Sequence, residues 1–227
     1  MIVAVLQLGL AMVFAVTDRR WAAAALGDAA MDHPHTPQEA ALVRTLCLDA
    51  GIGSAAVAVH TGIETGVALW GFTYLTEAVG ISPVIAAGLA SGYWVAMFVG
   101  RIVLGSLAER IGSWHVMAMA VGGMVIAAAL AIAATPRTAT TAMLLFGLSI
   151  APMYPLLVLT TAERTSPAVA DRMIGFQAAA SALGAAAIPL LIGVAMGVSI
   201  GAFGLAIAPL CLTAALVHLA MQLRRGR

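Results

Sequence analysis

His60 and Glu64 are the two residues whose types and spacing are best suited to chemistry. They stand four positions apart in a long apolar run, so on a helix they lie one turn apart on the same face. A charged carboxyl at the centre of a membrane span costs on the order of 2.5–3.5 kcal/mol, so such a residue usually has a role. We expect Glu64 to bind a proton or a solute hydroxyl, with His60 sharing the proton or orienting the carboxyl. The alternative is a structural Glu64 that is protonated or paired with His60.

Further polar and aromatic positions are candidates for contact with a solute. Trp70 and Tyr93 carry rings that can stack on a sugar, although aromatic residues near a membrane interface often only anchor a helix. Gln177 and Ser181 stand four apart and share a face. Polar side chains in lipid often bond a neighbouring helix, so both roles stay open for Gln177, and packing is favoured for Ser181.

Pro152 and Pro155 flank Tyr154 near the end of another apolar run. Because proline has no backbone N–H, it leaves a carbonyl one turn earlier without its helical partner and bends the helix. We therefore expect a hinge at these prolines and a cavity position for Tyr154.

Several kinds of chemistry are disfavoured by what the sequence lacks. It contains no lysine, which removes a retinal Schiff base. No metalloprotease or serine-hydrolase motif and no acidic metal cluster occurs, so we expect no enzyme, no metal site and no cofactor. His33 and His35 flank a proline, which is more typical of a solvated linker than of a metal site. Cys47 and Cys211 lie in or beside apolar runs, which favours packed thiols over a disulfide.

The elements that must position these residues are membrane helices. Of the 227 residues, 62% are hydrophobic and only 9% are charged, and the mean hydropathy is +1.03. Soluble domains carry roughly 25% charged residues, so this composition indicates a polytopic membrane protein. A net charge of +1 without a basic cluster gives no indication of nucleic-acid binding.

We expect an all-α integral membrane protein with seven transmembrane helices. The first covers residues 1–17, a cytoplasmic linker covers 18–38, and six helices with short connections fill 39–227. The six divide into two triplets of opposite topology, which is a repeat pattern of secondary transporters. The six expected spans are 51–74, 83–107, 114–134, 138–161, 173–196 and 199–221.

The distribution of arginine predicts the orientation. Cytoplasmic loops carry an excess of basic residues, and one side of the expected helices carries every arginine except Arg137. We therefore expect a multi-pass protein of the cell membrane with its N-terminus outside and its C-terminus in the cytoplasm. Arg19, Arg110, Arg164 and Arg224 would then lie in the cytoplasm.

A stretch rich in glycine and charge joins two of the expected spans. It reads Gly-Arg-Ile-Val-Leu-Gly-Ser-Leu-Ala-Glu-Arg-Ile-Gly over residues 100–112. This stretch resembles the loop signature of the major facilitator superfamily in the form found after the eighth helix, and the resemblance implies a part in conformational change. A generic cytoplasmic hairpin whose charges only fix orientation is the alternative. The matching residues are Gly100, Arg101, Gly105, Glu109, Arg110 and Gly112.

Three other stretches, 60–70, 151–155 and 174–184, are similar to the seventh, tenth and eleventh helices of the fucose/galactose/H+ symporter-like group of that superfamily. The resemblance implies a proton-linked transporter of a small polar solute such as a sugar, present as its sixth to twelfth helices. A seven-helix receptor or sensor in the lipid bilayer is the alternative. We expect the solute and the proton to be bound by Glu64, His60, Trp70, Tyr154 and Gln177.

The resemblance also implies a missing N-terminal half, which another chain or a second copy would supply. Gly88, Gly92, Ala96 and Gly100 recur every four residues, and such a stripe of small side chains lets another helix approach closely in lipid. We expect this stripe, and the similar face over 175–184, to lack partners in the chain alone. We also expect that the chain alone does not transport, because alternating access requires two bodies that rock about a site.

Overall fold

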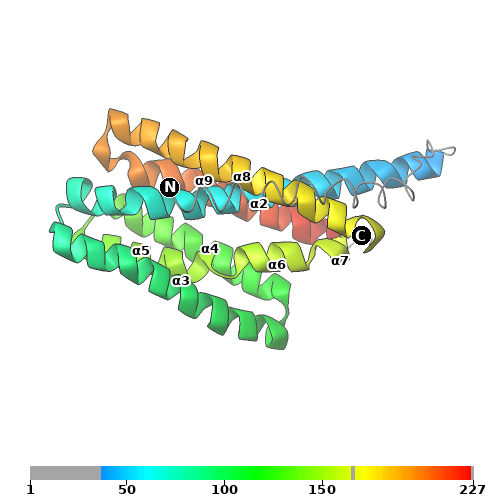
Figure 1. The fold of residues 1–227 in the computed structure, drawn as a ribbon, viewed down its shortest axis with the longest axis horizontal. Coiled ribbons are helices and arrows are strands. Elements are labelled where there is room, and N and C mark those ends of the chain that lie inside the picture. Colours follow the sequence, from blue (N-terminus) through cyan, green and yellow to red (C-terminus); the bar gives the residue numbers. More distant parts are fainter. Residues whose placement is uncertain (1–36, 165–166, 226–227) are drawn as a thin grey trace, which may run out of the picture. The chain divides into compact units, whose positions relative to one another are not determined.

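The computed structural model describes residues 37–164 and 167–225, and the chain divides into two units, 1–45 and 46–227. The expected first helix and most of the linker lie outside the described residues. The account below concerns the second unit, in which all regular structure of the described residues is helical (Figure 1). Six of its helical segments are long and apolar enough to cross a membrane, so the described part is that of a multi-pass membrane protein.

The six candidate spans match the six expected after the linker, and the helices are named as in Figure 1. Each antiparallel pair is joined by a short connection, as in other helical bundles. The helices are α2 (Pro37–Thr73, continued by a π-helical turn at Tyr74–Ala78), α3 (Pro83–Ile111), α4 (Ser113–Ala133), α5 (Pro136–Ile150), α6 (Met153–Leu159), α7 (Thr161–Arg164), α8 (Pro167–Val198) and α9 (Phe203–Arg225), with a 3₁₀ turn at Ile200–Ala202 before α9.

Helix boundaries follow local sequence signals. Pro83 stands in the first turn of α3, where its missing N–H costs nothing. Thr135 caps α5 through a reciprocal pair of hydrogen bonds with Thr138. Gly112 separates α3 from α4 with a φ of 90°, a conformation that L side chains rarely adopt, so the last glycine of the loop signature is required by the backbone.

The helix is interrupted at Pro152, one of the two prolines at which the sequence predicts a bend. A two-residue turn at Ala151 and Pro152 separates α5 from α6 within one candidate span. Because Pro152 has no N–H, the Leu148 carbonyl has no helical partner. That carbonyl lies against Gly100 of α3, so close that a Cβ on Gly100 would collide with it.

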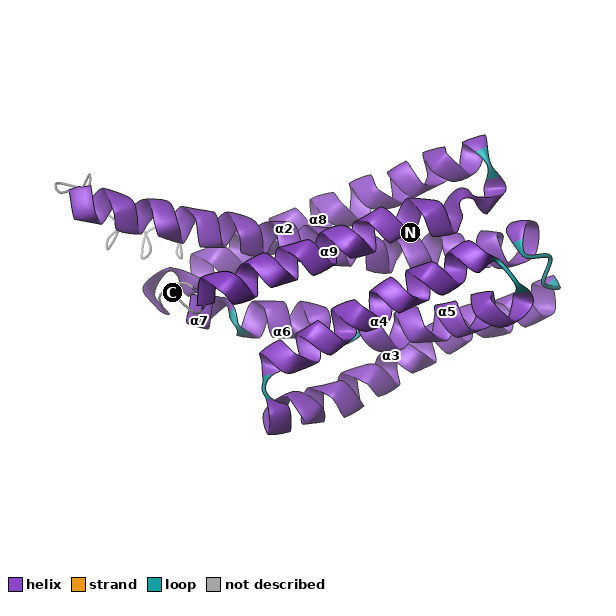
Figure 2. Cartoon of the chain, turned by 180° about the vertical axis from the view of Figure 1, so that it is seen from behind, coloured by secondary structure: helices purple, strands orange, loops and turns teal. Residues whose placement is uncertain are grey.

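The helix α2 runs between α3 and α8, with α4 and α9 on the other side of the bundle (Figures 1 and 2). Glycines make its contact with α8 close. A Cβ on Gly62 would overlap Ile188, and one on Gly184 would overlap the backbone of Ala58. At the far end of the bundle the Tyr74 ring stacks on Phe203, with 4.6 Å between ring centres.

The expectation that both small-residue faces lack partners is wrong for most of their length. Gly100 meets Leu148 and Ala151 of α5, and Gly184 meets α2. Only the Gly88 and Gly175 ends are open, since an added Cβ at either position would meet nothing within 4 Å. These glycines therefore serve contacts inside the bundle, and a second half is not needed to explain them.

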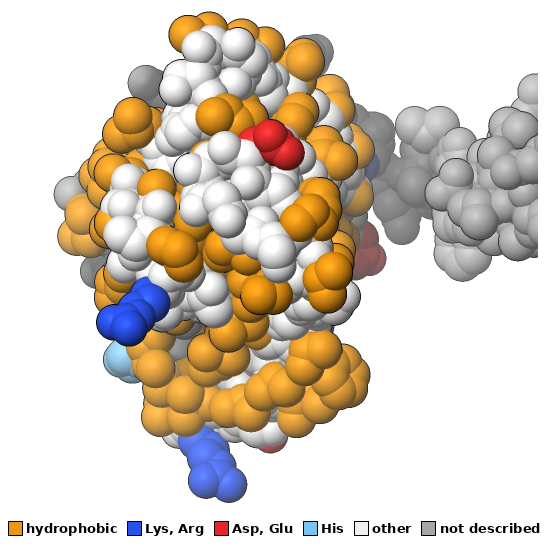
Figure 3. All heavy atoms as spheres, turned by 90° about the vertical axis from the view of Figure 1, so that its left-hand side faces the viewer, with side chains coloured by type: hydrophobic (Ala, Val, Ile, Leu, Met, Phe, Trp, Pro, Cys, Tyr) orange, Lys and Arg blue, Asp and Glu red, His pale blue; other side chains and the backbone are white. Residues whose placement is uncertain are grey.

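Much of the remaining helix surface is apolar and exposed, as expected for contact with lipid. Phe98 of α3, Leu183 of α8 and Leu216 of α9 are each at least 66% exposed. Figure 3 looks at the end of the bundle that carries the turn between α2 and α3, where charged side chains are few. The opposite end carries Asp49, Glu109, Arg110, Glu163, Arg224 and Arg225.

Candidate functional site

An ion pair joins α2 to α3 at the depth of the span centre. Glu64 is at the middle of the candidate span Gly51–Ala78, and an oxygen of its carboxyl lies 4.0 Å from the Arg101 guanidinium. The sequence places Arg101 at the join between two spans, but the structure places it inside α3, ten residues before the helix ends at Ile111. Ten residues of helix measure about 15 Å, so Arg101 is a mid-span charge and not a loop residue.

The two side chains differ in how far they are enclosed. The Glu64 side chain is 20% exposed, whereas the Arg101 side chain is 55% exposed. Apart from Glu64, the only contact of the guanidinium among the described residues is the Met97 sulfur at 3.9 Å. A guanidinium has five N–H donors in a fixed fork, so most of the donors on Arg101 are uncommitted.

Tyr93 of α3 bonds to the backbone of Glu64. Its side chain is 1% exposed, and its hydroxyl donates a hydrogen bond of 3.2 Å to the backbone carbonyl of Glu64. Tyr93, Met97 and Gly100 are all buried and form the inward face of α3. Because Gly100 packs closely against α5, the backbone of the next residue, Arg101, is held at this place along α3.

The side of α2 between α3 and α8 is open and carries hydroxyl groups. Successive residues of a helix are about 100° apart; Glu64 faces Arg101 on α3, while Gly66 faces Ile192 on α8. Thr65 therefore stands between the two contacts, and it is partly exposed. Ser54 and Thr61 fall on the same side at spacings of eleven and four residues and are also partly exposed. The Thr61 hydroxyl oxygen itself is buried, and the Thr65 hydroxyl donates a hydrogen bond of 2.8 Å to the Thr61 carbonyl.

His60 is not part of this open side. It is 1% exposed and faces the backbone of Ile150, close to the break between α5 and α6. Neither ring nitrogen has a hydrogen-bond partner of good geometry among the described residues. The counter-charge of Glu64 is consequently Arg101, and the pairing of Glu64 with His60 that the sequence left open is not what the structure contains.

Two other expected site residues make internal contacts. The Trp70 indole N–H donates to the Pro189 carbonyl at 2.8 Å, and its ring fills the space beside Gly193 of α8. Gln177 is 1% exposed and exchanges hydrogen bonds of 3.0 and 3.1 Å with the Thr161 hydroxyl. Both residues thus connect helices. For Gln177 this is the packing role that the sequence left open, whereas for Trp70 the alternative considered was an anchor at the membrane interface.

The remaining candidates lie nearer the arginine-rich end of the bundle. Tyr154 is partly buried and packs against a second apolar cluster around Met117 and Leu157. Gly105, Glu109 and Arg110 of the loop signature follow Arg101 toward the end of α3, and both charged residues are exposed. None of these residues meets the Glu64–Arg101 pair in a contact that the structure records.

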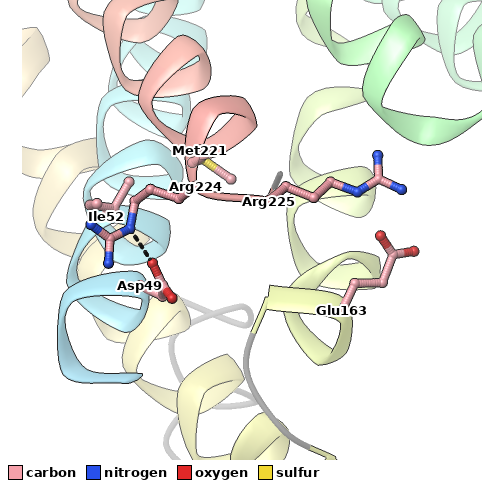
Figure 4. A pocket seen from close by; sticks show the side chains of 6 residues that line it. All are labelled: Asp49, Ile52, Glu163, Met221, Arg224 and Arg225. Carbon is pink, nitrogen blue, oxygen red and sulfur yellow. Dashed lines mark hydrogen bonds and ion pairs between the residues drawn. The ribbon is translucent and has the colours of Figure 1, made fainter. Parts of the chain in front are cut away.

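A second charged cluster lies at the arginine-rich end (Figure 4). Arg224 of α9 donates to the Asp49 carboxylate of α2 at 2.5 Å. Arg225 stands 5.1 Å from the centre of the Trp114 ring, and the Trp114 indole donates to Glu163 at 3.1 Å. A pocket of about 140 Å³ lies between the Asp49–Arg224 pair and the side chains of Glu163 and Arg225. This cluster ties together α2, α4, α7 and α9.

Sequence comparison adds no family assignment to this geometry. The chain matches no protein-family model and no curated protein. Among the described residues, no group of three metal-ligating side chains comes together. The arrangement that distinguishes the bundle is therefore the mid-span pair with the open, hydroxyl-bearing side of α2. The sequence assigned Arg101 to the conformational loop motif and not to solute or proton binding, although the expected span 83–107 already contained position 101.

Proposed function

We propose that the described helices form one wall of a secondary transporter and that the open side of α2 borders the path of a small polar solute. The observation that carries this proposal is the Arg101–Glu64 pair at the depth of the span centre. Charged side chains at this depth almost always face a bundle interior or a water-filled cavity. The exposed half of Arg101 is therefore better explained by a polar path than by lipid.

Three other features support the proposal. Ser54 and Thr65 are partly exposed on the side of α2 next to the pair, where a solute would need hydrogen-bond partners. The break between α5 and α6 gives irregular backbone within a span, which secondary transporters use near their sites. The resemblance of residues 100–112 to the major facilitator loop points to the same class. The resemblance of 60–70, 151–155 and 174–184 to the fucose/galactose/H+ symporter-like group suggests proton-linked transport of a sugar-like solute.

The charge distribution supports an orientation. Arginine gathers at the end where α9 finishes, and only Arg137 lies at the other end among the described arginines. By the positive-inside rule we place the arginine-rich end in the cytoplasm. In a chain that lacks cysteine elsewhere, a Ser199→Cys variant should then react with an external thiol reagent, and a Ser113→Cys variant should not.

Water access to α2 tests the proposed path. In a chain with Cys47 and Cys211 replaced by alanine, Ser54→Cys and Thr65→Cys should react with a membrane-impermeant maleimide in proteoliposomes. Leu212→Cys and Leu216→Cys of α9 are the matched controls, since these leucines are 53% and 67% exposed on an apolar face. Protection of both α2 cysteines to the level of the α9 controls would contradict a polar path.

Transport by the purified chain is the second test. One wall encloses no cavity, so we expect no saturable uptake of a radiolabelled sugar into proteoliposomes that hold a proton gradient. Robust saturable uptake would mean that the chain supplies both walls, for example as two copies, and would remove the proposal of a missing half.

A further inference from the structure

The mid-span guanidinium has more binding capacity than the protein uses. Arg101 approaches Glu64 at 4.0 Å, which is longer than the 2.7–2.9 Å of a charge-assisted hydrogen bond. Its side chain is 55% exposed and approaches Glu64, the residue before Thr65 on α2. An arginine fork is suited to a planar anion that accepts two parallel hydrogen bonds.

We propose that Arg101 binds the carboxylate of a hydroxylated organic acid, such as a sugar acid, and that Glu64 takes up a proton when this anion binds. The proposal rests on the proposed transport function and narrows its solute from a polar molecule to an anionic one. The rest of the acid would lie along the open side of α2, beside Thr65.

Charge balance links the anion to the proton. In the empty site one carboxylate, Glu64, faces one guanidinium. A solute carboxylate on the same guanidinium would place two negative charges together in a low dielectric, and two carboxylates that share a site do not both stay ionised. A proton on Glu64 removes this repulsion, so anion and proton arrive together and the site remains neutral.

In the part of the chain that the structure describes, no other group near Glu64 is placed to neutralise the second negative charge in place of this proton. Tyr93 of α3 faces the same carboxyl, but its hydroxyl already donates to the Glu64 carbonyl. His60, one turn away on α2, is buried against Ile150 and points to a different helix. No further charged side chain of the described residues makes a recorded contact with Glu64.

Binding of D-galacturonate and D-galactose to the full purified chain tests the proposal, because the two sugars differ at the carbon that carries the carboxylate. The readout is protection of the Thr65→Cys variant from maleimide and the shift in its thermal unfolding. We expect galacturonate and the open-chain acid gluconate to protect and galactose to have little effect. Arg101→Gln should abolish protection and Arg101→Lys should weaken it, whereas Arg137→Gln, at the far end, should not.

A second measurement follows the proton. In weakly buffered solution, galacturonate binding should take up close to one proton per chain, and Glu64→Gln should bind the acid without this uptake. Equal protection by galactose, protection that survives Arg101→Gln, or no protection by any carboxylate tested would overturn the proposal. If Thr65→Cys still reacts readily in those cases, the polar path stands and only the anionic solute is lost; if it never reacts, the transport proposal itself fails.

Discussion

The two charged clusters of the bundle differ in how fully their members are satisfied. At the arginine-rich end, Arg224 makes a short, direct hydrogen bond to Asp49, and Arg225 lies over the Trp114 ring. At the span centre, Arg101 and Glu64 only approach each other, and most donors of the guanidinium are unused. The end cluster resembles a structural clasp between helix ends, whereas the central pair keeps capacity for something else.

Depth makes this difference informative. Water is available at the ends of the helices, so an unpaired charge there costs little, yet the structure pairs it well. Near the span centre an unpaired charge is expensive, yet there the pairing is loose. Stability alone does not explain a loose pair where pairing matters most, and a role in binding does.

The largest expected effect is on the central pair. Glu64→Gln should lower the free energy of unfolding by about 2–3 kcal/mol, because it leaves a mid-span guanidinium without a counter-charge. Arg101→Gln should cost a similar amount, and the double variant should recover part of the loss. Unfolding by SDS in mixed micelles, followed by circular dichroism, measures all three. Strict additivity of the single losses would show that the pair is not coupled.

The close contact behind the pair gives the next largest effect. Gly100→Ala should destabilise the chain by about 1–2 kcal/mol, since its methyl group would overlap Leu148 and Ala151 of α5. It should also move Arg101 away from Glu64 and weaken acid binding. Gly88→Ala is the matched control, because an added methyl group there meets nothing within 4 Å. Equal effects of the two variants would mean that α3 is not held at Gly100.

The sequence was sufficient to predict the helices but not the neighbours of each side chain. Apolar runs, Pro83 and Gly112 predict six spans and their boundaries, because those signals act within a few residues. Glu64 could be recognised as a mid-span carboxyl from its position alone. Its partner, Arg101, could not be predicted. Side chains come together either because they are four residues apart on one helix or because two helices pack, and the sequence shows only the first kind of neighbour.

Contacts between helices, which the sequence does not show, also explain why the roles of Trp70 and Gln177 could not be decided from the sequence. Trp70 and Gln177 are polar or aromatic residues within spans, which suits both a solute site and a contact between helices. Trp70 bonds Pro189, which is far away in the sequence, and Gln177 bonds Thr161, which no sequence pattern singles out. Only the fold therefore shows that these two residues make contacts between helices. The hydroxyl-bearing side of α2 was equally hidden, since its meaning depends on where α3 and α8 contact that helix.

A smaller effect is expected at the end cluster. Asp49→Asn should lower the free energy of unfolding by about 0.5–1 kcal/mol, as for a pair near water. The Arg224–Asp49 pair lies at the arginine-rich end of the bundle, where the ions of bulk solution reach it, so salt should reduce this loss. The loss caused by Glu64→Gln should change little with salt. A loss for Asp49→Asn that is as large as that for Glu64→Gln, and as insensitive to salt, would remove the contrast between the clusters.

The smallest expected effect is that of Trp114→Phe in the same end cluster. Phenylalanine keeps an aromatic face for Arg225 but loses the indole N–H that donates to Glu163. Because Glu163 is exposed, water can replace this donor, so the loss should be about 0.5 kcal/mol. Trp114→Leu is the comparison, since it removes the ring as well and should cost more, through the lost cation–π contact and the lost packing around a largely buried side chain. If Trp114→Phe also abolished galacturonate protection of the Thr65→Cys variant, the end cluster would be coupled to the central site, and its assignment as a purely structural clasp would be wrong.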